Sequence, residues 1–425
     1  MRVIARYTVV FLIILIVACA LLYAAGLIPQ AALKQHMLET MDQLTLEGVN
    51  PGVLYAGHPR SSLDNYSESR ILMQSYSMNT ASSAGSVLTN PGWEPENFDK
   101  ETVFAEMRSA VQSDAASNLT YTRYWMGFRA VVRPLMLLMN YMDMRQLIQW
   151  TFFLLLGAVI LLIYKKTGSF WIALGFVFTI SQLNPVVISG CFQYSTCFIL
   201  AFIGMLISLT ARFRKFSASM LFFVLGAATQ YFDFYTAPIL TFGLPMLALL
   251  LRKQQDPESD FRFRSNARLL GAAFAAWMIA YVAMWLAKLA LTSVFTGENA
   301  FQESFLRVSA WMFEPSENVS ALKMIPLALF NCAINMVDLV PLAVELALLI
   351  AYLVRIVRRR PQKQVWAEQS IYLLVAALPV LWIMAAAKPA YNHMYFQYRG
   401  LGVTLFAEIL FLLGTAFPSR QKKER

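Results

Sequence analysis

Residues Tyr7–Leu27 read YTVVFLIILIVACALLYAAGL, and this run contains no charged side chain. Arg2 and Arg6 precede it. At roughly 20 residues the run is long enough to cross a bilayer and longer than the apolar core of a secretory signal peptide. No small-residue cleavage site followed by a clean break is evident. We therefore predict an uncleaved first transmembrane helix over 1–29, with its N-terminus in the cytoplasm.

The composition of the whole chain is typical of a polytopic membrane protein. Of 425 residues, 58% are hydrophobic and only 14% are charged, and the mean hydropathy is +0.52. The 35 Lys and Arg exceed the 25 Asp and Glu, but the excess lies mostly in short runs between apolar segments. Such runs are topology signals, so we expect no nucleic acid partner. The four cysteines lie in or beside hydrophobic segments without metal-ligand spacing, which predicts neither a disulfide framework nor a metal site: Cys19, Cys191, Cys197 and Cys332.

A long polar segment, 30–124, follows the first helix. Charged residues, Ser, Asn, Pro and Gly recur too often in it for a bilayer crossing, so we predict an extracytoplasmic loop domain. It begins with an amphipathic helix over Gln30–Glu47 and contains a short helix near Val103–Gln112. The apolar face of the first of these helices consists of Leu33, Met37, Met41 and Leu44.

A segment rich in aromatic and basic residues, 125–145, joins this domain to the remaining spans. Arg129 and Arg133 are four residues apart and share one face of a helix, with Trp125 and Phe128 available for the flanking surface. We predict an amphipathic segment that lies in the membrane interface.

Residues 146–417 contain the remaining apolar runs. The predicted spans are Leu147–Tyr164, Phe170–Ile188, Cys191–Ala211, Ser217–Gln230, Thr236–Leu251, Leu269–Leu291, Ile325–Val354, Ile371–Ala387 and Leu401–Phe417. With this assignment every basic cluster, including the tail 418–425, lies on the cytoplasmic side, as the positive-inside rule requires. The sequence thus predicts an all-α polytopic membrane protein with about ten transmembrane helices. Its long first extracytoplasmic loop carries short helices, and both termini are cytoplasmic.

The same topology collects ionisable residues at the extracytoplasmic ends of the spans. Such groups are costly near apolar helices unless they pair, reach water or bind a ligand. An anionic lipid-linked substrate would use the cations for its phosphate and a carboxylate to accept a proton. The residues are Asp64, Glu68, Arg123, Arg129, Arg133, Asp233, Glu298, Glu303, Lys388, His393 and Arg399.

The segment SSLDNYSESR (Ser61–Arg70) and its position soon after the first helix resemble the GT-C superfamily of membrane glycosyltransferases. Members combine many spans with a long first external loop that holds a catalytic Asp or Glu. Here the matching residues are Asp64 and, one helical turn later, Glu68; the Asp-Asp or Glu-Asp pair of some members is missing, which leaves the choice of base open. The chain is also similar to a bacterial subset in RYW (Arg123–Trp125), Arg133-Pro134, FDF (Phe232–Phe234) and QYR (Gln397–Arg399).

The resemblance implies an enzyme of the bacterial cytoplasmic membrane. It would move a sugar, with inversion, from a polyprenyl-phosphate-linked donor to an extracytoplasmic glycan, lipid or protein acceptor. Asp64 is the candidate base, with Glu68 and Asp233 as the other candidate carboxylates. The residues expected to bind the donor phosphate are Arg129, Arg133, Lys388, His393 and Arg399. The scheme requires no metal and no cofactor.

Other interpretations fit the same residues. Asp64 is a good helix N-cap, as are the neighbouring serines, and Lys388 and Arg399 could extend to lipid headgroups. His393 could be a hydrogen-bonded interfacial side chain. For the whole chain, a polysaccharide polymerase or ligase usually carries its large loop late in the sequence, and a transporter tends to show internal repeats. The early loop favours the transferase over these and over a non-catalytic scaffold.

Overall fold

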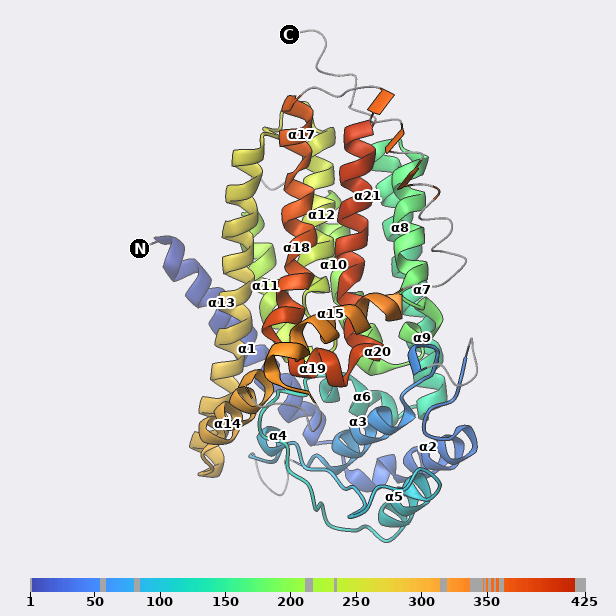
Figure 1. Cartoon of the computed structure of the whole chain (residues 1–425). Helices are drawn as coiled ribbons and strands as arrows, with labels where there is room; N and C mark the ends of the chain where they lie inside the picture. The colour runs from blue at the N-terminus through green and yellow to red at the C-terminus, as the bar shows by residue number, and fades with distance from the viewer. Residues whose placement is uncertain are drawn as a thin grey trace.

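The computed structural model describes residues 2–53, 59–79, 85–210, 217–232, 235–313, 319–336, 347, 349–350, 353–354, 357–358 and 363–416. Within these residues the chain is helical, and its β contacts are two isolated bridges that join Gly52 to Ser62 and Gly92 to Leu119. Figure 1 shows a bundle of long helices with a group of short helices at one end. We call that end of the bundle the loop end.

The long helices account for the membrane part of the chain. The bundle contains α1 (Arg2–Gly26), α7 (Tyr141–Thr167), α8 (Phe170–Gln182), α9 (Pro185–Ser189), α10 (Phe192–Thr210), α11 (Ala218–Phe232), α12 (Leu240–Gln255), α13 (Phe263–Thr296), α17 (Lys363–Gln369), α18 (Ile371–Ala385) and α21 (Gly402–Ala416). Six described segments are long and apolar enough to cross a bilayer: Val3–Gly26, Tyr141–Thr167, Phe192–Thr210, Phe263–Thr296, Lys363–Ala385 and Met394–Thr415. Phe170–Gln182, Ala218–Phe232 and Lys323–Met336 are shorter apolar helices. The chain is a multi-pass membrane protein, as predicted, whereas the count of about ten spans is not established by the described residues.

Two predicted spans differ from the structure. The run Phe170–Ile188 is broken, because α8 ends at Gln182 and Asn184 has a left-handed backbone (φ 58°) before Pro185 begins α9. Asparagine tolerates this conformation, and proline suits the first helical position because its missing N–H would be unpaired there. The described part of Ile325–Val354 is mainly α15 (Ala321–Met336), which lies obliquely across the bundle near the loop end (Figure 1).

The loop end is built from η1 (Gln30–Leu33), α2 (Lys34–Glu47), η2 (Pro59–Ser61), α3 (Asn65–Ser77), α4 (Ser86–Thr89), α5 (Val103–Gln112) and α6 (Arg129–Met136). The two helices predicted from periodicity are present, and the predicted apolar face, Leu33, Met37, Met41 and Leu44, is fully buried. The core of these helices continues into the bundle through Tyr141, Ile148 and Phe192. The loop domain is therefore continuous with the membrane part.

Four further short helices complete the loop end: α14 (Ala300–Phe313), α19 (Ala387–Asn392), α20 (Met394–Gln397) and η3 (Tyr398–Leu401). α15 packs against α19, α20 and η3. These late elements thus meet the early loop domain at the same end of the bundle (Figure 1).

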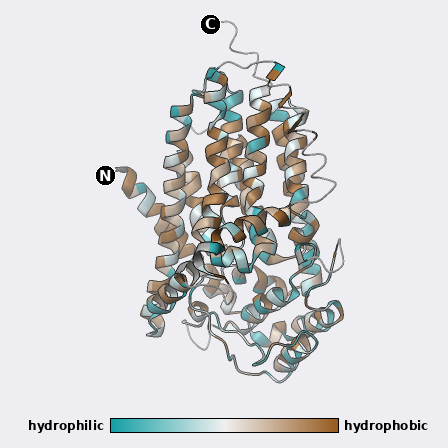
Figure 2. Ribbon diagram, viewed as in Figure 1, coloured by the Kyte–Doolittle hydropathy of each residue, from teal (hydrophilic) through white to brown (hydrophobic). Residues whose placement is uncertain are grey.

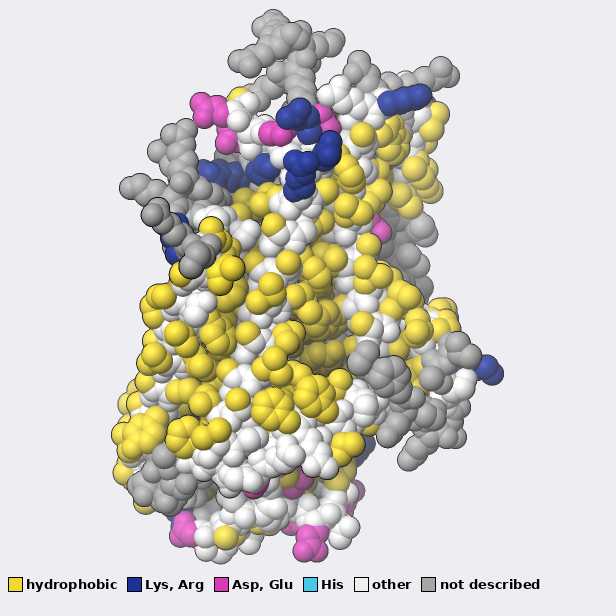
Figure 3. Space-filling view, turned by 90° about the vertical axis from the view of Figure 1, so that its left-hand side faces the viewer, with side chains coloured by type: hydrophobic (Ala, Val, Ile, Leu, Met, Phe, Trp, Pro, Cys, Tyr) yellow, Lys and Arg dark blue, Asp and Glu magenta, His cyan; other side chains and the backbone are white. Residues whose placement is uncertain are grey.

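The polarity of the surface follows the bundle axis. Figure 2 shows hydrophobic residues along the long helices and hydrophilic ones towards both ends. Figure 3 shows a broad apolar belt, with Lys and Arg gathered at the end opposite the loop end. Lys165 and Lys166 end α7, and Arg252 and Lys253 lie in the last turn of α12. Between these ends, α11 and α13 approach so closely that a Cβ at Gly226 would overlap the carbonyl oxygen of Trp277.

Candidate active site

Asp64 is held at the start of α3 by backbone pairing and by its own side chain. The chain before α3 runs antiparallel to 49–53, with Leu63 N donating to Pro51 O (3.0 Å) and Asn65 N to Val49 O (3.0 Å). The Asp64 carboxylate then caps α3, accepting from Ser67 N (3.0 Å) and from Ser67 Oγ (2.7 Å). The capping interpretation is thus confirmed. Each carboxylate oxygen takes one of these bonds, which leaves further acceptor capacity on both.

The charged neighbours of Asp64 come from two distant parts of the chain. η2, just before Asp64, lies beside α20. Arg70, one turn and a half further along α3, and His393, at the start of α20, act electrostatically on the Asp64 carboxylate. Asp64 in turn acts on the phenols of Tyr194 and Tyr395. The structure therefore brings Asp64 and His393 together, as the predicted cluster requires.

Burial dominates the acid–base properties of this pair. Asp64 is 7% exposed, and desolvation raises the pKa of its carboxyl despite the opposing hydrogen bonds from Ser67 and the charges of His393 and Arg70. Burial also lowers the pKa of His393, which Asp64 opposes. The imidazole stacks on Phe396 with ring centroids 5.1 Å apart. A carboxylate with a raised pKa is a stronger base than an exposed one, which suits proton abstraction near neutral pH.

Arg399, in η3, is 1% exposed. Its guanidinium carbon is 4.2 Å from the ring centroid of Tyr194 and 5.2 Å from that of Tyr398. Its hydrogen bonds in the described chain are long: Nε donates to Leu183 O at 3.3 Å, and Nη1 donates to Tyr395 O at 3.5 Å. Tyr194 interacts with both Arg399 and Asp64. Arg399 is thus positioned by aromatic rings, and its donors are only weakly used by the protein.

The break between α8 and α9 positions the late segment. Tyr398 Oη donates to Leu183 O (3.3 Å) and accepts from Asn184 Nδ2 (3.2 Å). Gln397 Nε2 donates to Tyr235 O (2.6 Å). The interrupted helix thus provides the carbonyl and amide groups that hold η3 against the bundle.

The Glu68 side chain connects α3 to two helices of the bundle by hydrogen bonds. It is fully buried, and its carboxylate accepts from Tyr141 Oη (2.6 Å), Phe192 N (2.8 Å) and Gln193 N (2.9 Å). Phe192 and Gln193 begin α10, so the carboxylate satisfies backbone donors at a helix N-terminus. Desolvation nevertheless raises the pKa of Glu68 to about 7. We conclude that Glu68 joins α3 to α7 and α10, and that Asp64 has the more available carboxylate.

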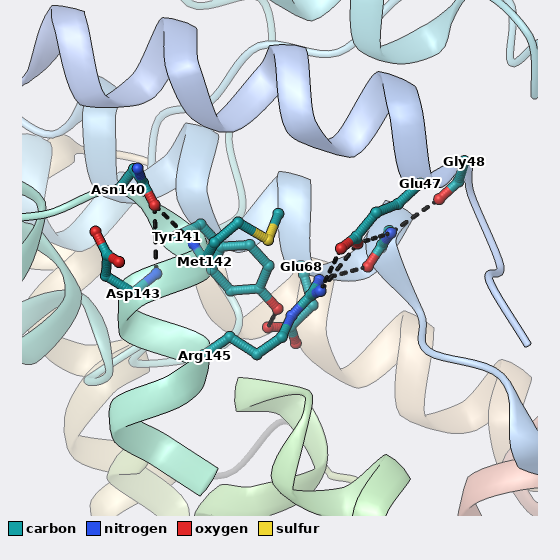
Figure 4. A network of polar contacts seen from close by, with 9 residues as sticks. Glu47, Gly48, Glu68, Asn140, Tyr141, Met142, Asp143 and Arg145 are labelled. Carbon is teal, nitrogen blue, oxygen red and sulfur yellow. Dashed lines mark hydrogen bonds and ion pairs between the residues drawn. The ribbon is translucent and has the colours of Figure 1, made fainter. Parts of the chain in front are cut away.

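A second polar network, shown in Figure 4, strengthens the same junction and was missed in the sequence. Arg145 on α7 donates through Nη1 to both oxygens of Glu47 (2.8 and 2.9 Å) and through Nη2 to Asn65 Oδ1 (2.9 Å). Asn65 donates in turn to Glu47 Oε2 (3.0 Å) and to Gly48 O (2.9 Å). Asn65 follows Asp64 directly, so this network fixes the backbone that carries the candidate base.

Arg129 and Arg133 do not join the Asp64 cluster. Arg133 donates to carbonyl oxygens at two helix ends: Ala25 O (3.0 Å) in the last turn of α1 and Ile28 O (2.6 Å) just after it, and Ser75 O (2.5 Å) and Tyr76 O (2.7 Å) in the last turn of α3. Asp64 caps the other end of α3, about 20 Å away for a 13-residue helix. Both arginines are fully buried. Their side chains donate hydrogen bonds to backbone carbonyls.

Among the described residues, the remaining ionisable ones that the sequence singled out contact groups other than Asp64. Lys388 on α19 donates to Ala310 O (3.3 Å) in α14. Arg123 pairs with Glu303 (3.0 Å), and Glu298 is exposed. Asp233 lies outside the described residues.

The described residues contain no group of three His, Cys, Asp or Glu side chains placed to hold a metal ion. A scan against protein-family models, a search of curated proteins and a search of solved structures found no match to this chain. The site's own chemistry is therefore the basis for a functional proposal.

Proposed function

We propose that the protein is a membrane glycosyltransferase that moves a sugar from a polyprenyl-phosphate-linked donor to an extracytoplasmic acceptor hydroxyl. The observation that carries this proposal is a cluster in which Asp64, from the loop domain, interacts with His393, from the late segment, and in which both Asp64 and Arg399 interact with Tyr194. A base near an arginine at the end of a membrane bundle suits a substrate whose phosphate is anchored in lipid.

In the proposed reaction the Asp64 carboxylate accepts the proton of the acceptor hydroxyl as its oxygen bonds to the anomeric carbon. The bond from that carbon to the donor phosphate breaks, and the phosphate leaves with the electron pair. Arg399 is the cation best suited to the departing phosphate, because the protein uses its guanidinium donors only weakly. His393 is the nearer partner of Asp64 and would hold the carboxylate or the acceptor by hydrogen bonding.

The distribution of charge supports an extracytoplasmic loop end. The last turns of α7 and α12 carry Lys165, Lys166, Arg252 and Lys253. Lys and Arg side chains gather at the end opposite the loop end (Figure 3). By the positive-inside rule that end faces the cytoplasm, in a bacterial cytoplasmic membrane, and the site faces outwards.

The test is transfer of radiolabelled sugar from a panel of polyprenyl-phosphate-linked donors by the purified full-length protein. Asp64→Asn keeps a good N-cap for α3 while removing the base, so we expect a folded protein whose rate falls by roughly 10²–10⁴. Asp143→Asn, an exposed carboxylate in the first turn of α7, is the matched control and should keep full activity. Full activity in Asp64→Asn would place the base elsewhere, and no transfer by the wild type from any donor would contradict the proposal.

A further inference from the structure

Two buried cations lie at the loop end, away from Asp64, and have no acidic partner within the described residues. Lys288 on α13 and Arg129 on α6 are both fully buried. The ionisable groups that act on Lys288 are Arg129 and Cys19, and those that act on Arg129 are Tyr231 and Arg133. No carboxylate of the described chain is among them. Two cations without a carboxylate partner among the described residues are costly to bury, and an anionic ligand would lower that cost.

The protein satisfies these cations only in part. Lys288 Nζ donates to Leu88 O and lies 5.9 Å from the ring centroid of Trp125. Arg129 Nη2 donates to Val87 O (2.7 Å) and Trp125 O (3.3 Å), and its Nε donates to Met126 O (3.1 Å). Arg129 Nη1 is buried and has no hydrogen-bond partner within the described structure. A guanidinium nitrogen left unpaired in a buried position is a donor available to a ligand.

An apolar cavity lies on the other side of residues that the two cations contact, and its lining includes neither cation itself. Its volume is about 300 Å³, and its wall is formed by α1, α4, α13 and Trp125. This wall includes residues that hold the two cations. The Val87 and Trp125 carbonyls accept from Arg129, and the Leu88 carbonyl accepts from Lys288. The ring of Trp125 also faces Lys288. At its rim Tyr23 is 46% exposed and Phe295 is 62% exposed, so the cavity opens on the surface of the bundle.

The position of the cavity matches the depth of lipid headgroups. It lies beside the last turns of α1 and α13, two candidate spans that both end at the loop end (Figure 1). An apolar wall that opens at this level takes up a hydrocarbon chain, whereas a free ion would gain nothing from it.

We propose that this cavity binds an anionic lipid of the surrounding bilayer, with the lipid chain between α1 and α13 and its phosphate beside Lys288 and Arg129. The flexible Lys288 side chain turns from Leu88 O to a phosphate oxygen, and Arg129 Nη1 gives a second donor. The proposal is independent of the transferase proposal, because its test needs no sugar donor.

The test is native mass spectrometry of the full-length, delipidated protein with added dioleoylphosphatidylglycerol. We expect one tightly retained lipid in the wild type and at least about tenfold weaker retention in Lys288→Met. Ala20→Trp should have the same effect by covering the mouth of the cavity with both charges intact. The matched controls are Lys253→Met, a partly buried lysine at the other end of the bundle, and Leu21→Trp, an exposed position on the face of α1 opposite the cavity; both should bind as the wild type does.

Two further arms identify the source of the phosphate. Dioleoylglycerol, which has the chains without phosphate, should bind at least about tenfold more weakly. Glycerol 3-phosphate, which has no chain, should not displace the lipid. Equal retention in Lys288→Met and wild type, equal binding of dioleoylglycerol, or displacement by glycerol 3-phosphate would each overturn the proposal. If Lys288→Met does not fold, Ala20→Trp and the dioleoylglycerol comparison decide the question.

Discussion

Replacement of Arg133 by methionine distinguishes a structural arginine from a substrate-binding one. The side chain donates four hydrogen bonds to carbonyls near the ends of α1 and α3. If two of these four carbonyls remain without a donor, at about 1–3 kcal/mol each, the free energy of unfolding falls by about 2–6 kcal/mol. That is a large share of the roughly 5–15 kcal/mol that keeps a typical domain folded.

The assay is thermal unfolding of the purified protein in detergent, followed by tryptophan fluorescence, together with the KM for the donor. We expect the melting temperature of Arg133→Met to fall by about 4 °C or more. Arg108→Met is the control, because Arg108 makes a half-exposed ion pair with Asp42 that contributes at most about 1 kcal/mol. Arg133→Met with the stability of the wild type and a raised KM would refute the structural reading and restore a role in phosphate binding.

Two further predictions concern stability. Because burial raises the pKa of Glu68 to about 7 from its ordinary 4.5, the folded protein retains a proton that the unfolded chain releases between these values. The free energy of unfolding should therefore fall by up to about 3 kcal/mol as pH rises from about 5 to 7. Glu68→Gln should flatten this dependence in melting curves across that range, and parallel curves for variant and wild type would contradict it. Gly226→Ala should destabilise by about 1–3 kcal/mol, because its Cβ overlaps the Trp277 carbonyl; Gly271→Ala on α13, where a Cβ meets open space, is the control, and equal melting temperatures would contradict the prediction.

The elements that sequence predicted well are those whose pattern is local. The helical spacing that buries Met37 and Met41 can be read within α2 itself. The long apolar runs of α7 and α13 can be recognised because a span must match the thickness of the bilayer. The break at Asn184-Pro185 was missed within an apolar run, although an Asn-Pro pair is a turn signal. What the break does depends on Tyr398, which is far away in sequence.

The candidate site was predicted in part. The position of Asp64 after the first helix marked the carboxylate, and the late aromatic segment marked His393 and Arg399. The sequence could not distinguish Arg399 from Arg133. An arginine that binds phosphate and one that donates to backbone carbonyls look the same in a sequence, because the partner atoms come from distant parts of the chain. Lys288 was overlooked although a lone lysine in an apolar span is itself a signal.

The Glu68 contacts tie the biogenesis of the protein to one order of events. The carboxylate is made early, but the Phe192 and Gln193 amides that it accepts from belong to a helix begun 124 residues later. Arg133 likewise reaches back across more than 100 residues to the end of α1. During synthesis the Glu68 carboxylate therefore lacks two of its hydrogen-bond donors until the start of α10 has been made. A chain released before that point would bury this carboxylate without those donors, so the loop domain cannot reach its final packing ahead of the bundle.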